Sequence, residues 1–156
     1  MVGGISIEFD TRKLDQKLAG LDSVVKNAQP IFEDIGNDLI TYYGNEVFTS
    51  GGAALKGGGW RSLANATIEA RTKRTGYYKQ APIATGKILI WTGRLMNGFK
   101  KEASRVQLRI HNIVSYFKYH QKGGGRLPKR EMLAITPRTI KTVNDKFREA
   151  INKKIA

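Results

Sequence analysis

The C-terminal stretch 136–155, TPRTIKTVNDKFREAINKKI, carries the clearest structural signal in the sequence. Thr136 can cap a helix with its hydroxyl, and Pro137 suits the first helical position, where its missing N–H costs nothing. Lys153 and Lys154 fall in the last turn, where the helix dipole favours cations. We therefore predict a helix with one apolar face against the core. That face contains Ile140, Val143, Phe147, Ile151 and Ile155.

A second amphipathic helix is predicted further upstream, over residues 29–49. Pro30 fits its first turn, and Glu33 and Asp34 lie near its start, where the dipole favours negative charge. Two glycines interrupt it, each at a cost of about 1 kcal/mol relative to alanine, and we expect them to allow close packing against another element. Its apolar face follows the same spacings of three and four: Phe32, Ile35, Leu39, Tyr43 and Val47.

Strand signals lie on both sides of this helix. Alternating apolar and polar residues predict strands at 4–10 and 105–110. Residues 132–135 are a further strand candidate, 88–91 form a short buried segment, and 115–121 fit a helix or a strand equally well. The order predicts an α+β fold, with a small, mainly antiparallel sheet packed with N-terminal helices and a C-terminal helix.

Three shorter features complete the expected fold. A weak amphipathic helix is predicted around residues 14–21, and another at 65–74 with Asn65 as its cap. Thr92 is expected to cap a short helix that ends at about Phe99. Residues 111–112 are predicted to form a turn after the second strand.

Long glycine-rich loops separate these elements, at about 50–59, 75–87 and 122–127. Such loops are uncommon in compact domains unless they are functional or disordered, so we predict flexible surfaces that become ordered against a partner. The apolar residues 53–55 are interpreted as part of an unpacked loop. Trp60, directly after three glycines, is expected to anchor the end of that loop to the core.

Length and composition limit the class of protein. The chain of 156 residues fits a single domain over 1–156, and it has no cysteine for disulfides or thiolate metal sites. No secretory signal or membrane-length apolar run is recognisable, so a protein made in the cytoplasm is expected. The formal charge of +14, from 27 Lys and Arg against 13 Asp and Glu, favours a polyanionic neighbour: nucleic acid, an anionic membrane face or an acidic protein surface.

A search for catalytic or metal-binding patterns finds none that is convincing. His111 and His120 are the only histidines, and neither has the partners of a hydrolase triad or the spacing of a metal site. The glycines at 57–59 are followed by Trp-Arg-Ser, and not by the Gly-Lys-Ser/Thr of a phosphate-binding loop. We therefore predict no catalytic residue, no metal and no cofactor.

Two basic clusters allow two interpretations. Lysine and arginine neutralise phosphates while aromatic rings stack on bases, so both clusters could bind nucleic acid. No nucleic-acid-binding signature accompanies them, which favours a solvated face or a subunit contact. One cluster contains Arg71, Lys73, Arg74, Tyr77, Tyr78 and Lys79, with the first three expected to be exposed. The other contains Lys118, Lys122, Arg126, Lys129 and Arg130.

Four blocks follow one another in a fixed order: GWRSL at 59–63, ILIWTGRL at 88–95, HQKG at 120–123 and LPKREML at 127–133. Together they resemble the phage virion morphogenesis family, the tail-completion proteins of Mu-like and P2-like phages. The family pattern has G-x-W-x-x-L, I-L-x-x-T-G-x-L, Y-A-x-x-H-Q-x-G and I-P-x-R-x-F-L. The chain departs from it at Phe117, where alanine is usual, and at Glu131 and Met132, where proline and phenylalanine are usual.

The resemblance implies a structural protein that completes the tail or joins it to the head. It implies a ring of identical subunits, expected to be six, around the DNA channel of the virion; whether the chain is monomeric before assembly stays open. Other neck or tail proteins and packaged DNA are the implied partners. The motif residues expected to shape the fold and its loops are Trp60, Leu63, Thr92, Gly93, Leu95, Tyr116, His120, Gly123, Pro128 and Arg130.

Within this interpretation, Trp60 and Leu95 are expected in the core and Thr92-Gly93 at a turn. Arg94 and Arg130 are the best candidates for contacts between subunits or to a carboxylate. The expected contacts to partners or DNA involve Arg71, Lys73, Arg74, Arg94, Lys122, Arg126 and Lys129. A basic nucleic-acid-binding protein is the main alternative, and a hydrolase that uses His120 is the weakest.

Overall fold

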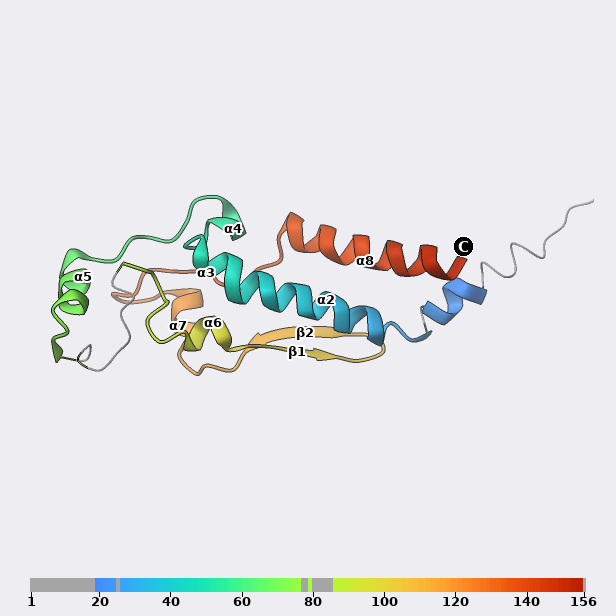
Figure 1. Cartoon of the computed structure of the whole chain (residues 1–156), viewed down its shortest axis with the longest axis horizontal. Helices are drawn as coiled ribbons and strands as arrows, with labels where there is room; N and C mark the ends of the chain where they lie inside the picture. Colours follow the sequence, from blue (N-terminus) through green and yellow to red (C-terminus); the bar gives the residue numbers. More distant parts are fainter. Residues whose placement is uncertain (1–18, 25, 77–78, 80–85, 156) are drawn as a thin grey trace, which may run out of the picture.

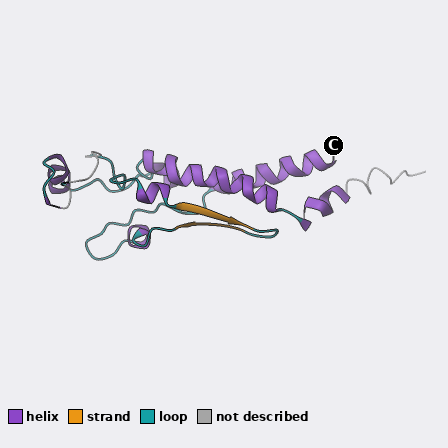
Figure 2. Ribbon diagram, turned by 60° about the horizontal axis from the view of Figure 1, so that its bottom comes forward, coloured by secondary structure: helices purple, strands orange, loops and turns teal. Residues whose placement is uncertain are grey.

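The computed structural model describes residues 19–24, 26–76, 79 and 86–155. It has an α+β fold, as predicted (Figure 1). Helix α2 lies between a two-stranded antiparallel hairpin and the C-terminal helix α8, so both helices cover the same side of the hairpin (Figure 2). Residues 19–24 are helical. The strand predicted at 4–10 lies outside the described residues.

The predicted helix over 29–49 is confirmed, but it has three parts. Helix α2 (Gln29–Thr41) continues into a π-helical segment η1 (Tyr42–Glu46) and then α3 (Val47–Thr49). The π segment coincides with Gly44, where a Cβ would lie only 2.8 Å from the backbone oxygen of Met96. Gly36 likewise lets the hairpin approach, since a Cβ there would lie 2.6 Å from the Lys101 side chain. The expected role of both glycines in close packing is confirmed.

The acidic residues near the start of α2 bind lysines of neighbouring elements. They lie outside its first turn, so the predicted dipole interaction is wrong. Glu33 is paired with Lys101 of the hairpin at 2.5 Å, and Asp34 with Lys146 of α8 at 2.7 Å. These ion pairs tie α2 to the layers on both sides.

The sheet consists of β1 (Phe99–Ala103) and β2 (Leu108–Asn112), with Phe99 opposite Asn112 and Ala103 opposite Leu108. Three predictions are corrected here. The strand predicted at 105–110 starts three residues later, because residues 105–107 belong to the hairpin turn. The turn predicted at 111–112 is part of β2. Phe99 begins a strand where the end of a helix was predicted.

The candidate strand at 132–135 is an extended segment without a strand partner in the structure as described. The side chain of Gln121 replaces that partner. Its Nε2 donates to the Leu133 carbonyl at 2.6 Å, and its Oε1 accepts from the Met132 N–H at 2.8 Å. Met132 is fully buried. The ambiguous segment 115–121 forms the helix α7 (Phe117–Lys122).

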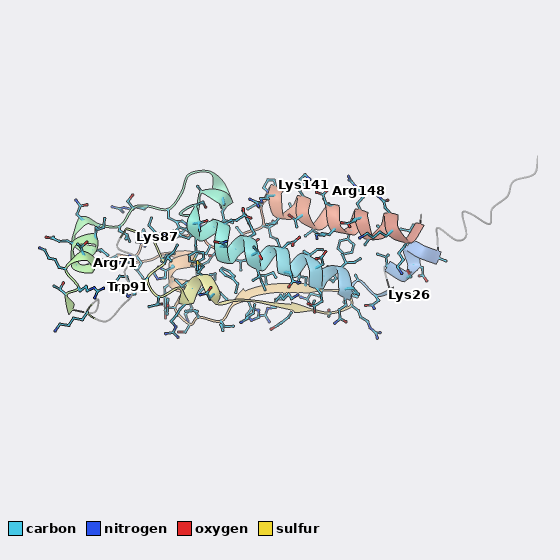
Figure 3. The ribbon with its side chains drawn as sticks, in the orientation of Figure 1. Lys26, Arg71, Lys87, Trp91, Lys141 and Arg148 are labelled. Carbon is cyan, nitrogen blue, oxygen red and sulfur yellow. The ribbon has the colours of Figure 1, made fainter. Side chains whose placement is uncertain are left out.

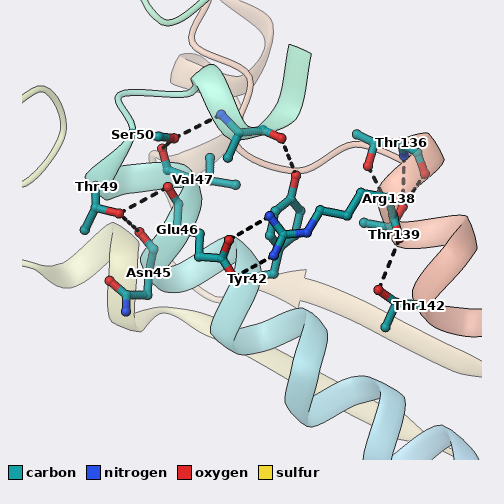
Figure 4. A network of polar contacts seen from close by, with 11 residues as sticks. Tyr42, Asn45, Glu46, Val47, Thr49, Ser50, Thr136, Arg138, Thr139 and Thr142 are labelled. Carbon is teal, nitrogen blue, oxygen red and sulfur yellow. Dashed lines mark hydrogen bonds and ion pairs between the residues drawn. The ribbon is translucent and has the colours of Figure 1, made fainter. Parts of the chain in front are cut away.

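Helix α8 (Pro137–Ile155) begins as predicted. The hydroxyl of Thr136 accepts from the Thr139 N–H at 3.2 Å, and the hydroxyl of Thr139 accepts from the Thr136 N–H at 2.9 Å, which is a reciprocal cap. Arg138, in the first turn, holds both carboxylate oxygens of Glu46, at 2.7 and 2.8 Å, and lies over the Tyr42 ring (Figure 4).

Residues 53–55 pack against the core, so their interpretation as an unpacked loop is wrong. Ala53–Lys56 forms the short helix α4, and Leu55 is buried. The Tyr42 hydroxyl donates to the Ala54 carbonyl at 2.6 Å and fixes this turn beside η1 (Figure 4).

Helix α5 (Asn65–Thr72) lies at the end of the molecule that is farthest from the C-terminus (Figure 1). Helix α6 (Arg94–Asn97) lies between α5 and the hairpin. Asn65 does not cap α5: the N-cap is Ala64, and no side chain bonds there. Residues 88–91, predicted to be buried, are half-buried and form no strand. The turn expected at Thr92-Gly93 is confirmed, since Thr92 Oγ1 accepts from the Arg94 N–H at 3.4 Å.

Candidate functional site

A pocket of about 680 Å³ lies between α5, α7 and the two segments at 61–64 and 126–130. We call it the cationic pocket. It is lined by Arg61, Ser62, Leu63, Ala64, Thr67, Arg71, Leu89, His120, Arg126, Leu127, Pro128 and Arg130. Four of the ten motif residues therefore meet here: Leu63, His120, Pro128 and Arg130.

Arg130 is the most enclosed polar side chain of the pocket. Only 7% of the residue is exposed. Its backbone N–H donates to the His120 carbonyl at 2.8 Å, and its Nη2 donates to the Arg61 carbonyl at 3.2 Å. Its Nε is buried and has no hydrogen-bond partner among the described residues. The guanidinium therefore keeps one N–H donor that no described group satisfies.

Arg71 is also buried, at 8% exposure, so the prediction that it lies on an exposed basic face is wrong. Its Nη1 donates to the Lys87 carbonyl at 2.9 Å, and its guanidinium lies 4.9 Å from the centre of the Trp91 ring (Figure 3). The ring faces a cation, which is a favourable arrangement. Arg71 thus connects α5 to the motif block at 88–95.

The electrostatics of the pocket are dominated by like charges. Burial lowers the pKa of Arg130, and the neighbouring charges of Arg71 and Arg61 lower it further. Burial also holds the pKa of His120 below its usual value, with Arg130 as the second cause. A guanidinium stays protonated in proteins, so the pocket is cationic with a neutral imidazole at pH 7. No Asp or Glu is among the lining residues that the structure describes.

The other motif residues support the pocket or lie away from it. The Tyr116 ring packs edge-on against His120, with ring centres 6.2 Å apart. Gly123 lies against Lys129, where a Cβ would be 2.8 Å from the backbone nitrogen. Leu95, as expected, is in the core. Thr92 and Gly93 form the turn before α6, so they shape the fold and do not line the pocket.

Trp60 is half-buried at the edge of the core. Its ring meets Phe48 edge-on, with ring centres 5.4 Å apart, and its Nε1 donates to the Glu131 carbonyl at 2.8 Å. The anchoring role expected of Trp60 is confirmed, although the side chain is not fully enclosed.

The remaining basic candidates are exposed. Arg126 lines the cationic pocket. Lys73 pairs with Glu69 at 2.6 Å. Arg74, Arg94, Lys122 and Lys129 are also exposed. Tyr77 and Tyr78 lie outside the described residues, so the first basic cluster is only partly described.

A second surface was not predicted from the sequence. An apolar groove of about 760 Å³ runs between α2, β2, residues 133–135 and α8. Three large aliphatic residues along it are exposed to solvent: Val106 by 81%, Ile135 by 86% and Ile140 by 50%. Ile140 belongs to the stripe predicted to face the core. The groove leaves part of that stripe uncovered.

The two histidines lie on different elements. His111 lies on β2, with its Nε2 3.8 Å from Glu102, while His120 lies on α7. Across the described ranges, no cluster of three or more His, Cys, Asp or Glu could hold a metal ion. No helix in those ranges is both long and apolar enough to cross a membrane. What the surfaces offer is charge and apolar area for contacts.

The model of the phage virion morphogenesis family matches residues 9–152 of the chain. Comparison with curated proteins and with solved structures gave no match. The family match includes the motif blocks that converge on the cationic pocket, and it agrees with a structural or assembly role in a phage virion. The chain belongs to the phage virion morphogenesis family.

Proposed function

We propose that this protein is a non-enzymatic subunit of a ring that completes the tail, or joins it to the head, of a tailed phage or prophage. The ring is a homo-oligomer, expected to be a hexamer, that sits at the head–tail junction or the tail end and is assembled in the host cytoplasm. Its other partners are neck or tail proteins, with packaged DNA as a further contact.

The apolar groove is the observation that carries this proposal. Val106, Ile135 and Ile140 come from three different elements and expose aliphatic surface around one groove. Monomeric proteins rarely expose such apolar patches to water, whereas in a ring the next subunit covers them. A contact between two different faces, repeated around an axis, closes into a ring when the rotations between neighbouring subunits add up to a full turn.

The first experiment removes the protein from the phage. Lysates of a phage without this gene should accumulate separate heads and tails in the electron microscope, and a plasmid copy should restore joined particles. Normal joined particles without the protein would contradict a role in tail completion or joining.

The second experiment tests the groove. Ile135→Asp places a charge in it, and Ile113→Asp is the matched control, because Ile113 is 62% exposed but does not line it. Ile135→Asp should fold yet fail to complement and to form rings, while Ile113→Asp should do both. An Ile135→Asp protein that assembles like the wild type would exclude the groove as the ring contact.

A further inference from the structure

The cationic pocket contains the buried guanidinium of Arg130, whose Nε has no hydrogen-bond partner among the described residues. Arg130 is more than nine-tenths buried, and no Asp or Glu is among the described lining residues. The sequence between Gly76 and Gly86, which the structure describes only in part, contains no acidic residue either. Buried cations without a counter-ion are costly, so such a pocket favours an anion.

We propose that the cationic pocket receives the side-chain carboxylate of an Asp or Glu from another virion protein. Arg130 is its main donor, through the buried Nε–H that has no partner among the described residues. His120, whose Nδ1 is likewise buried without a described partner, is the second polar group. The hydroxyls of Ser62 and Thr67 line the same pocket.

The lining favours a protein side chain over the phosphates of a DNA duplex. Leu63, Leu89, Leu127 and Pro128 supply apolar walls, which suit the aliphatic stem of an acidic residue. The enclosed guanidinium of Arg130 lies below the surface, where we expect a carboxylate on a flexible stem to reach it. Duplex phosphates lie along the outside of a wide rod and would stop at the exposed Arg126.

We expect the acidic residue to come from a different protein. All ten Asp and Glu residues that the structure describes lie within 4.0 Å of a Lys, Arg or His nitrogen of the same chain. A second copy of this chain therefore brings no uncommitted carboxylate from those regions. The segment from Lys56 to Arg130, which carries the pocket, contains 17 Lys and Arg but only Glu69 and Glu102 as acids, and such an excess of cations suits an acidic partner.

This inference rests on the proposed assembly role, but the two can fail separately. If the pocket does not bind carboxylates, ring formation through the apolar groove is unaffected. A protein that binds carboxylates in the pocket but leaves heads and tails joined when deleted would refute the assembly role alone.

The test uses the full chain and two small probes. N-acetylglutamate amide carries one side-chain carboxylate, and N-acetylglutamine amide is its neutral isostere. We expect the glutamate probe to shift the NMR signals of Arg130 Nε–H and the His120 ring in a saturable way, and to raise the pKa of His120. The glutamine probe should shift neither signal. Equal shifts with both probes, or none with either, would overturn the proposal.

Two variants and a competitor sharpen this test. Arg130→Gln should weaken binding of the glutamate probe by about tenfold or more, as expected for loss of a charge-assisted hydrogen bond. Arg105→Gln removes an equal charge at an exposed position outside the pocket and should leave binding unchanged. If Arg130→Gln does not fold, the comparison of the two probes on wild-type protein still tests whether the pocket binds a carboxylate. A short DNA duplex that shifts the same two signals and displaces the probe would assign the pocket to nucleic acid instead.

Discussion

The indole N–H of Trp60 donates to the backbone carbonyl of Glu131, 71 residues further along the chain, at 2.8 Å. This bond joins two family blocks, the G-x-W-x-x-L block and the block that carries Arg130. Arg130 makes a second bond between the same two blocks, because its Nη2 donates to the carbonyl of Arg61, the residue after Trp60. The two blocks are therefore held side by side by reciprocal side-chain to backbone bonds. They form adjoining walls of the cationic pocket.

Trp60→Ala should destabilise the protein by about 3 kcal/mol, because it removes a large half-buried ring from Phe48 and breaks the bond to Glu131. Trp60→Phe keeps most of the ring and should lose about 1 kcal/mol, the usual contribution of one hydrogen bond. Urea unfolding measures both values. Equal losses in the two variants would show that the ring contact contributes nothing beyond the bond.

Gly52→Ala should be more damaging than Gly57→Ala. Both glycines have positive φ, 88° and 80°, which costs an alanine about 1–2 kcal/mol. A Cβ at Gly52 would also lie 2.3 Å from Trp60 Nε1, whereas one at Gly57 meets nothing within 4 Å. Overpacking should add a further 1–3 kcal/mol, roughly, at Gly52 alone. Matching unfolding midpoints for the two variants would contradict the close approach of Trp60.

The helices were predictable because their signals are local. The Thr136-Pro137 start of α8 and the apolar spacing of 29–49 need no partner to be recognised. The bounds of the hairpin strands were not predictable, because they depend on how the two strands pair. Val106, Leu108 and Ile110 alternate correctly, but Ser104 accepts bonds from the N–H groups of Val106 and Gln107 and makes a turn there. Periodicity cannot show where pairing begins.

The site was predictable only in part, for a similar reason. Family motifs pointed to Leu63, His120, Pro128 and Arg130, and the structure brings them into one pocket. Nothing in the sequence distinguishes the buried Arg71 from its exposed neighbour Lys73, because burial depends on Trp91 and the Lys87 carbonyl. The apolar groove also depends on which faces stay uncovered after folding.

The depressed pKa of His120 predicts pH-dependent stability. Its ring takes up a proton more readily in the unfolded chain, whose pKa is the ordinary 6.5, than in the folded protein. Stability should therefore fall as the pH drops from about 7 through 6.5 toward the lower folded value. His120→Gln removes this proton uptake and should flatten the slope between about pH 7.5 and 5.5. Urea unfolding across that range measures it, and an unchanged slope in the variant would show that His120 is not the group responsible.

We predict that contact with packaged DNA uses exposed cations near the pocket in sequence, and not the guanidiniums inside it. Lys122, Arg126 and Lys129 are exposed. Replacing all three with Gln should weaken binding to duplex DNA and reduce the slope of log K against log salt by about 2–3, since each phosphate contact contributes about 0.9. The exposed cations Lys141, Arg148 and Lys154 of α8, changed to Gln together, give a variant of equal charge at a site distant from the pocket. That control should keep most of the slope, because net charge alone contributes no fixed phosphate contact. If both triple variants lose the slope equally, DNA attraction is a property of the overall +14 charge and this surface has no special part in it.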